Sequence, residues 1–228
     1  LLLQGEASPT QKLLSGSNIV AFIDNEIADI DQLTKSLTAG GITPMLIDNS
    51  ADGLTQMAQK LEGLTGLTGI MIFSHGRSGL LDFGAGEIDA EALVTHQQQL
   101  AAIGQSLSQE GDILLYGCDV AAGDAGNSFV NAFAKATQAD IAASLDKTGS
   151  QALGGDWTLE VATGVIETTA FVDEGYDGTL ALPSGAASAW TSDDVANLTS
   201  ADVASLATAQ IADLTTEAVT AFTSAALA

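Results

Sequence analysis

Two residues that could carry out covalent catalysis stand at the ends of separate apolar segments. His75 follows the apolar run 69–74, and Cys118, the single cysteine among the 228 residues, follows the apolar run 112–117. A thiol acts as a nucleophile once it has lost its proton, and a nearby histidine can take up and return that proton. Only about 3% of a free thiol is ionised at pH 7, whereas a pKa of about 7 leaves roughly half of it ionised. If the pair is catalytic, we therefore expect a lowered pKa for Cys118.

Each of the two residues has a glycine beside it. Gly76 follows the histidine and Gly117 precedes the cysteine. Glycine lets the backbone turn sharply and lets a substrate come close. The backbone amides of Gly76 and Cys118 are therefore the expected donors to the oxyanion of a tetrahedral intermediate.

Three charged residues near the pair are candidates for a specificity pocket. Arg77 follows Gly76 directly and could receive an acidic side chain of a substrate. Asp119 or Asp124 could instead receive a basic side chain. The sequence does not choose between these alternatives.

The elements that must position these residues alternate between strands and helices. Continuous apolar runs predict buried strands, and apolar residues at helical spacing predict the helices between them. A small hairpin is expected at 79–88, and a pair of short strands is expected at the end of the domain. The predicted strands are 18–24, 42–47, 69–75, 112–118, 139–144, 157–161 and 165–167, and the predicted helices are 27–37, 54–61, 89–103 and 126–136.

This alternation predicts a three-layer α/β/α fold with right-handed crossovers and a mostly parallel sheet. In such sheets, ligands bind outside the carboxyl ends of the strands. Both His75 and Cys118 are expected there. We therefore predict that the tips of strands 69–74 and 112–117 are adjacent.

The two strand ends resemble those of the caspase–gingipain–separase clan of cysteine peptidases, in which the catalytic histidine precedes a glycine and the cysteine ends the next core strand. The resemblance covers roughly residues 17–170 and implies a caspase-like sheet, with His75 as general acid and base and Cys118 as nucleophile. The chain lacks the Gln-Ala-Cys-x-Gly motif of caspases, and Tyr116 stands where metacaspases have an acidic residue. The resemblance to this clan therefore does not predict specificity for either Asp or Arg at the cleavage site.

More narrowly, the runs 116–121, 142–144 and 154–160 are similar to an uncharacterised domain near the N-termini of giant bacterial surface and adhesin-type proteins. This resemblance implies a secreted protein at the bacterial cell surface, with other surface-protein repeats as partners. The expected function is that of a cysteine endopeptidase acting on polypeptides, its own chain included.

The alternative is an inert caspase-like module with a structural, assembly or adhesion role. Cys118 would then be a buried, vestigial thiol, as most lone cysteines after apolar strands are. A third alternative is a wholly structural segment, part of an acidic surface fibre.

The charge balance excludes several classes of partner. The chain has 29 acidic residues against 6 Lys and Arg, which gives a net charge of −23. Such a chain repels phosphate backbones and anionic lipids, so we expect neither nucleic-acid binding nor electrostatic membrane docking. No apolar run approaches the roughly 18 residues of a membrane span.

No cofactor or metal motif is present, and we expect no metal in the catalytic site. The acidic residues within 24–31 could bind calcium, because hard cations prefer clustered oxygen ligands. The glycine-containing loop of an EF-hand is absent, however. This absence favours the interpretation that these acidic residues are exposed to solvent and bind no ion.

The domain organisation follows from a change in composition after residue 180. We expect a lead-in at 1–16, an α/β domain at 17–180, a linker at 181–191 and an eight-residue repeat at 192–228. The repeat predicts short helical turns stacked as a solenoid. The segment 172–180 is rich in glycine and acid, so it is expected to be an exposed site of self-cleavage. If Arg77 lines the specificity pocket, Asp173 or Asp177 is the expected residue before the cut.

Overall fold

The protein is described by a computed structural model over residues 18–27 and 29–180. A six-stranded sheet with the order β2-β1-β3-β7-β8-β9 forms its centre. Neighbouring strands are parallel except at the last pair, where β9 runs antiparallel to β8. The strands of this sheet are β1 (Ile19–Asp24), β2 (Thr43–Ile47), β3 (Leu67–Phe73), β7 (Leu107–Tyr116), β8 (Asp140–Ala143) and β9 (Val161–Ala162).

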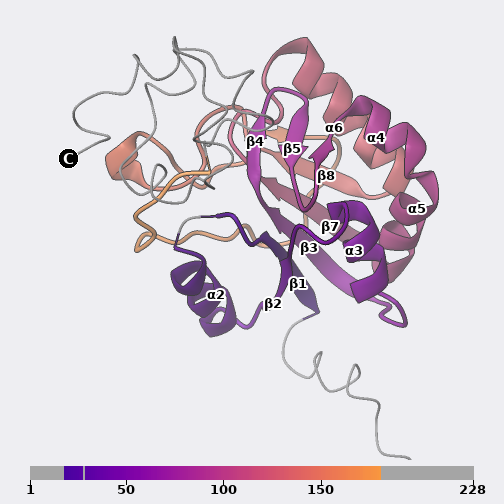
Figure 1. Cartoon of the computed structure of the whole chain (residues 1–228), viewed down its shortest axis with the longest axis horizontal. Helices are drawn as coiled ribbons and strands as arrows, with labels where there is room; N and C mark the ends of the chain where they lie inside the picture. Colours follow the sequence, from indigo (N-terminus) through magenta and orange to yellow (C-terminus); the bar gives the residue numbers. More distant parts are fainter. Residues whose placement is uncertain (1–17, 28, 181–228) are drawn as a thin grey trace, which may run out of the picture.

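Four helices cover one face of the sheet, as Figure 1 shows. Alternate residues of the central strands, such as Ile70 and Ile72 of β3, point into this layer, because side chains alternate along a strand. The helices are α3 (Gly53–Lys60), α4 (Ala90–Thr95), α5 (Gln97–Ser106) and α6 (Gly123–Thr137). Asp52 caps α3 and Asp89 caps α4, each by accepting a hydrogen bond from a backbone amide three residues on.

The other face is covered by α2 (Ile30–Ala39) and by the C-terminal part of the described chain. Met71 and Phe73 of β3 point into this layer. Residues 157–180 supply its second half with a largely irregular backbone, apart from β9. The α/β class and the mostly parallel sheet are thus confirmed, but the second outer layer contains a single helix.

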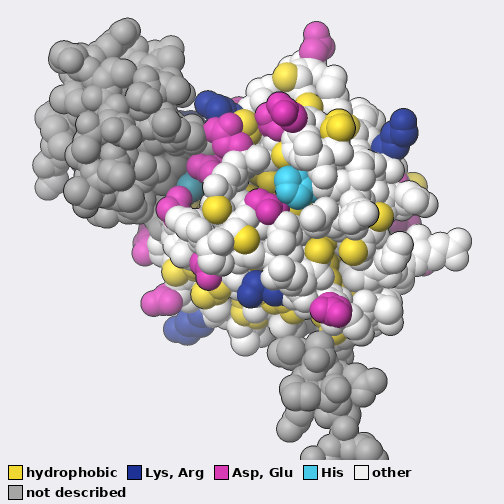
Figure 2. All heavy atoms as spheres, turned by 45° about the vertical axis from the view of Figure 1, so that its right-hand side comes forward, with side chains coloured by type: hydrophobic (Ala, Val, Ile, Leu, Met, Phe, Trp, Pro, Cys, Tyr) yellow, Lys and Arg dark blue, Asp and Glu magenta, His cyan; other side chains and the backbone are white. Residues whose placement is uncertain are grey.

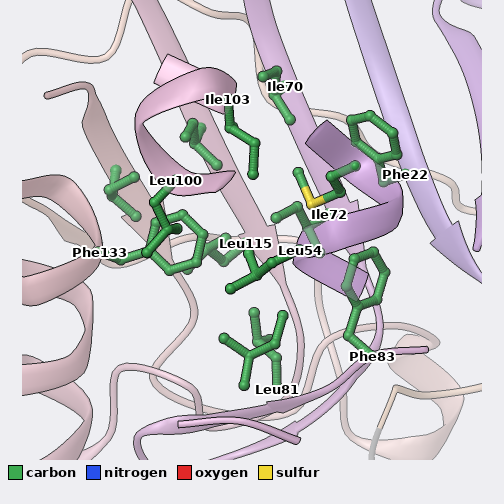
Figure 3. Packing of buried hydrophobic residues seen from close by; sticks show 14 of the residues in the cluster. Phe22, Leu54, Ile70, Ile72, Leu81, Phe83, Leu100, Ile103, Leu115 and Phe133 are labelled. Atoms are coloured by element: carbon green, nitrogen blue, oxygen red, sulfur yellow. The ribbon is translucent and has the colours of Figure 1, made fainter. Parts of the chain in front are cut away.

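A second, three-stranded antiparallel sheet follows β3 directly. It consists of β4 (His75–Arg77), β5 (Leu80–Asp82) and β6 (Glu87–Ile88). Leu81 of β5 and Phe83 just after it point into the core beside Leu54 of α3, as Figure 3 shows. These two side chains anchor the small sheet to the main one.

Several boundaries differ from the sequence-based prediction. The helix expected at 89–103 is two helices, because His96 adopts a non-helical conformation and its Nδ1 lies 2.9 Å from the Ala92 carbonyl oxygen. The helix expected at 126–136 begins three residues earlier, at Gly123. The strand expected at 165–167 is not formed. A 3-10 turn, η1 (Gln151–Leu153), follows β8.

The lead-in at 1–16, the linker at 181–191 and the repeat at 192–228 lie outside the described residues. Of the helices in the described part of the chain, none combines the length and the apolar character that crossing a bilayer demands. On the face shown in Figure 2, acidic side chains are widely spread and Lys and Arg are few.

Asp112 of β7 holds the irregular segment against the sheet. It is buried, and its Oδ2 accepts hydrogen bonds from the backbone amides of Glu167 at 2.9 Å and Thr168 at 2.7 Å. We expect Asp112→Ala to lower the free energy of unfolding by about 2–3 kcal/mol, because two backbone amides, that of buried Thr168 among them, lose their acceptor. Urea denaturation measures this. Asp112→Asn keeps one acceptor oxygen, so its free energy of unfolding should fall by less. Equal decreases in both variants would contradict the role of Asp112 as the acceptor for these amides.

Candidate active site

The ends of β3 and β7 lie side by side, as the sequence predicts. Phe73 pairs with Tyr116 in the parallel register, and one residue further on the Ser74 amide donates to the Tyr116 carbonyl at 3.1 Å. A methyl group placed on Gly76 would lie 3.0 Å from the Cys118 carbonyl oxygen and 3.2 Å from the Gly117 carbonyl carbon. The His75–Gly76 backbone therefore touches the Gly117–Cys118 backbone.

Cys118 lies in the layer beside α2, and His75 lies near the loop that leads into α2. Cys118 continues the alternation of Leu114 and Tyr116 and packs in the cluster beside α2. The Nε2 atom of His75 lies 3.5 Å from the carbonyl oxygen of Glu26, in the loop that joins β1 to α2. The structure thus brings both predicted catalytic residues to the carboxyl edge of the sheet.

Cys118 is held in a closed position. It is 1% exposed, and its Sγ accepts a hydrogen bond from the Thr148 amide at 3.1 Å and donates one to the Thr148 carbonyl at 3.7 Å. Burial raises the pKa of the Cys118 thiol to about 12, and the Thr148 amide only partly offsets this. The direction is opposite to the lowered pKa expected of an activated nucleophile, because burial disfavours the thiolate.

The cover over Cys118 is a backbone bridge between two loops. Gly149 forms an antiparallel bridge with Thr179, and the Leu180 amide donates to the Thr148 carbonyl at 2.9 Å. Leu180 is fully buried in the same cluster as Cys118. The segment 172–180 was expected to be exposed, and this is wrong for Asp173, Tyr176 and residues 178–180, which are buried.

The candidate specificity residues lie in different surroundings. Arg77 forms an ion pair with Glu87 at 3.0 Å, so its charge is already partnered. Asp119 adopts a left-handed backbone conformation with φ 60°, and burial raises the pKa of its carboxyl group. Asp124 is exposed in the first turn of α6.

Sequence reasoning did not assign two carboxylates to this edge of the sheet. Asp24, at the end of β1, is buried, and burial raises the pKa of this carboxyl group to about 6. Asp82 stands directly opposite His75 in the pairing of β4 with β5. The acidic end of the first strand was a visible signal, but nothing in the sequence placed Asp82 opposite the histidine.

Two other features lie on the α2 side of the sheet, near the β8 end. A pocket of about 850 Å³ lies over Leu114 and Ala142, between the sheet and residues 156–174. Nearby, the exposed carboxylates of Asp146, Asp156 and Glu160 come within 4.8 Å of one another. Two of the three are already hydrogen-bonded to backbone amides of the loop, with Asp156 Oδ1 accepting from Thr158 and Glu160 Oε2 from Leu145.

The fold and the site define an α/β protein with a histidine and a cysteine at adjacent carboxyl ends of a parallel sheet. Residues 20–180 match the family described as "Domain of unknown function (DUF4347)". The chain therefore belongs to this family, and the match spans nearly all of the described residues. No curated protein and no solved structure matches the chain.

Proposed function

We propose that this domain is a caspase-like cysteine endopeptidase and that the described structure is its closed state. The observation that carries the proposal is the contact of His75–Gly76 with Gly117–Cys118 at the carboxyl edge of the sheet. A dyad on neighbouring strand ends is the arrangement that the resemblance to the caspase–gingipain–separase clan implies.

In the open state, the reaction would use only groups of this chain and water. His75 removes the Cys118 proton, and the thiolate attacks the scissile carbonyl carbon to form a carbon–sulfur bond. The amides of Gly76 and Cys118 stabilise the oxyanion, and the His75 imidazolium protonates the leaving amine as the carbon–nitrogen bond breaks. Water then hydrolyses the thioester and regenerates the thiol.

Opening requires the bridge of residues 178–180 to leave Thr148 and Gly149. Substrate peptides bind to proteins as extended strands that add to an exposed backbone edge. The edge at 148–150 is next to Cys118 and is already paired with residues 178–180. The chain's own segment thus occupies the place that an extended substrate would take, and release of this segment makes both the thiol and the edge accessible.

A second candidate function is favoured by the burial of Cys118. An inert caspase-like module with a role in assembly or adhesion needs no ionised thiol, and the raised pKa of Cys118 suits it. Under either function, the resemblance to domains of giant bacterial surface proteins supports an extracellular location beside other surface-protein repeats.

Self-cleavage distinguishes the two functions. In the 228-residue chain carrying Gly149→Ala, which weakens the bridge, we expect new chain termini at or beyond residue 172, because a tethered site faces its own C-terminal segment at high effective concentration. Mass spectrometry maps the termini during incubation with and without calcium. The same chain with Cys118→Ala or His75→Ala should stay intact. Identical fragments in all three would favour the inert module.

A further inference from the structure

Three polar residues form a row across the small antiparallel sheet. His75 of β4 is directly opposite Asp82 of β5, and Asp82 is directly opposite Glu87 of β6. Residues directly opposite in an antiparallel pair carry their side chains on the same face, with Cβ atoms about 4.5–5.5 Å apart. The carboxylate of Asp82 therefore lies on the imidazole side of β4, between His75 and Glu87.

Asp24 forms hydrogen bonds to the segments that flank this row of residues. Its Oδ1 accepts the Glu26 amide at 2.8 Å, and its Oδ2 accepts the Gly84 amide at 2.7 Å. Glu26 supplies the carbonyl oxygen near His75, and Gly84 follows β5 by two residues. The buried Asp24 carboxylate thus links two segments through hydrogen bonds. One is the loop that contains Glu26, and the other is the turn that follows β5, the strand of Asp82.

The charges around His75 are predominantly negative. Asp24 and Glu26 lie at the end of β1 and just beyond it, and the charges of Glu26 and Asp82 both contribute to the raised pKa of Asp24. Arg77, on the same strand as His75, is paired with Glu87. On the β7 side stands Cys118, whose raised pKa keeps its thiol neutral in the closed state. Opposite charges within about 4–6 Å favour the charged form of a group.

We propose that Asp82 is a positioning residue for His75, which holds the imidazole in place across the β4–β5 pair and stabilises its protonated form. This inference rests on the proposed function, because the imidazolium is the form that would protonate the leaving amine. Asp82 itself touches no reacting atom. A pocket of about 360 Å³, lined by Glu26, Asn49, Asp82 and Glu87 among others, keeps one side of the carboxylate open to water.

The titration of the two histidines tests the proposal without any need for peptidase activity. The chain contains only His75 and His96, so their ring-proton signals can be followed by NMR across pH, and His96→Ala assigns them. We expect Asp82→Asn to lower the titration midpoint of His75 by about one pH unit, since a neighbouring carboxylate stabilises the imidazolium. Asp82→Glu keeps the carboxylate, so the titration midpoint of His75 should stay close to its wild-type value.

His96 provides a matched control, because its Nε2 lies 3.5 Å from Asp52 Oδ1. Asp52→Asn removes the carboxylate beside this second histidine and should leave the midpoint of His75 unchanged, whereas Asp82→Asn should lower it. A shift of less than about 0.2 pH unit at His75 in Asp82→Asn, or equal shifts at both histidines, overturns the proposal. If Asp82→Asn does not fold, the midpoint in Asp82→Ser supplies the same comparison.

The outcome for Asp82 is separable from the outcome for catalysis. A selective shift of His75 in a chain that never cleaves itself supports Asp82 as its positioning residue and removes self-cleavage, while cleavage of another polypeptide stays open. The opposite outcome is cleavage of the Gly149→Ala chain with no shift in the titration midpoint of His75 when Asp82→Asn is added. This result supports the peptidase and contradicts the role of Asp82 as a positioning residue.

Discussion

Cys118 in the native protein should react with iodoacetamide at least a hundredfold more slowly than a free thiol at pH 8. The thiolate is the reactive form. A rise of the pKa from 9.0 to about 12 lowers the thiolate fraction at pH 8 roughly a thousandfold relative to a free thiol. The 1% exposure of the residue restricts the reagent further. Mass spectrometry of the intact protein measures the rate, and denatured protein supplies the value for an accessible Cys118.

The rate should rise when the cover is loosened. At Gly149, φ is 131° and an added methyl group would lie 2.5 Å from the Gly178 carbonyl oxygen, so Gly149→Ala should displace residues 178–180. Gly154 also has a positive φ, but nothing lies within 4 Å of such a methyl group. Gly154→Ala therefore introduces the same kind of backbone strain without the contact, and it should leave the alkylation rate unchanged.

The opened variant also separates an activated thiol from a merely exposed one. If His75 acts on Cys118 after opening, His75→Ala in the Gly149→Ala background should slow alkylation, because the imidazolium stabilises the thiolate. Native protein that reacts as fast as denatured protein would show that Cys118 is not closed. Equal rates with and without His75 after opening would favour the inert module.

Gly126→Ala should destabilise the domain by about 3 kcal/mol or more. Gly126 lies in the first turn of α6, and a methyl group there would come 2.3 Å from the Ala121 carbonyl carbon and 2.7 Å from its oxygen. These are backbone atoms of the loop that follows Cys118, so the helix or the loop must move, and overpacking of this kind is costly. The free energy of unfolding from urea denaturation, with circular dichroism as the signal, measures the loss.

Gly86→Ala is the control for this substitution. Gly86 lies in the turn between β5 and β6, and nothing lies within 4 Å of its added methyl group. Its free energy of unfolding should stay within about 0.5 kcal/mol of the wild-type value, as is usual for surface changes. A Gly126→Ala protein as stable as Gly86→Ala would mean that α6 does not pack against the loop in solution.

The main sheet could be predicted because its central strands carry a strong local signal. β1, β3 and the second half of β7 are buried on both faces and are largely apolar, and strand–helix alternation then predicts a parallel sheet. The adjacency of the β3 and β7 ends follows from that topology. It is also the part of the candidate site that the structure confirms.

The position of Asp82 opposite His75 could not be predicted because it depends on register. The turn before β5 contains Gly79 at φ 75°, and it sets which residue of β5 faces His75. A slip of one residue would turn Asp82 to the opposite face of the small sheet. No apolar pattern in so short a hairpin fixes that register, and the anchoring by Leu81 and Phe83 emerges only in the assembled core.

The cover over Cys118 was missed for a different reason. Glycine and acid in 172–180 indicate an exposed segment, yet Tyr176 and Leu180 reach the core. The indole Nε1 of Trp157 donates to the Asp173 carbonyl at 3.0 Å, which fixes the path of the segment from far along the chain. Such tertiary contacts override local composition. The pKa of Cys118 depends on them, and no pattern around the cysteine reveals it.

The late position of the covering segment in the chain has a consequence for biosynthesis. Phe73 and Tyr116 stack at 4.6 Å between ring centres, and Trp157 and Phe171 pack against them edge-on or tilted. While the ribosome makes the chain, α2 can reach its face of the sheet early, but these stacked rings remain without their cover until residues 157–180 emerge. Thr168 must then return to bond the Thr68 carbonyl, 100 residues back. The domain thus becomes complete only at its last residues, and a chain interrupted before them presents an aromatic face of the kind that chaperones bind.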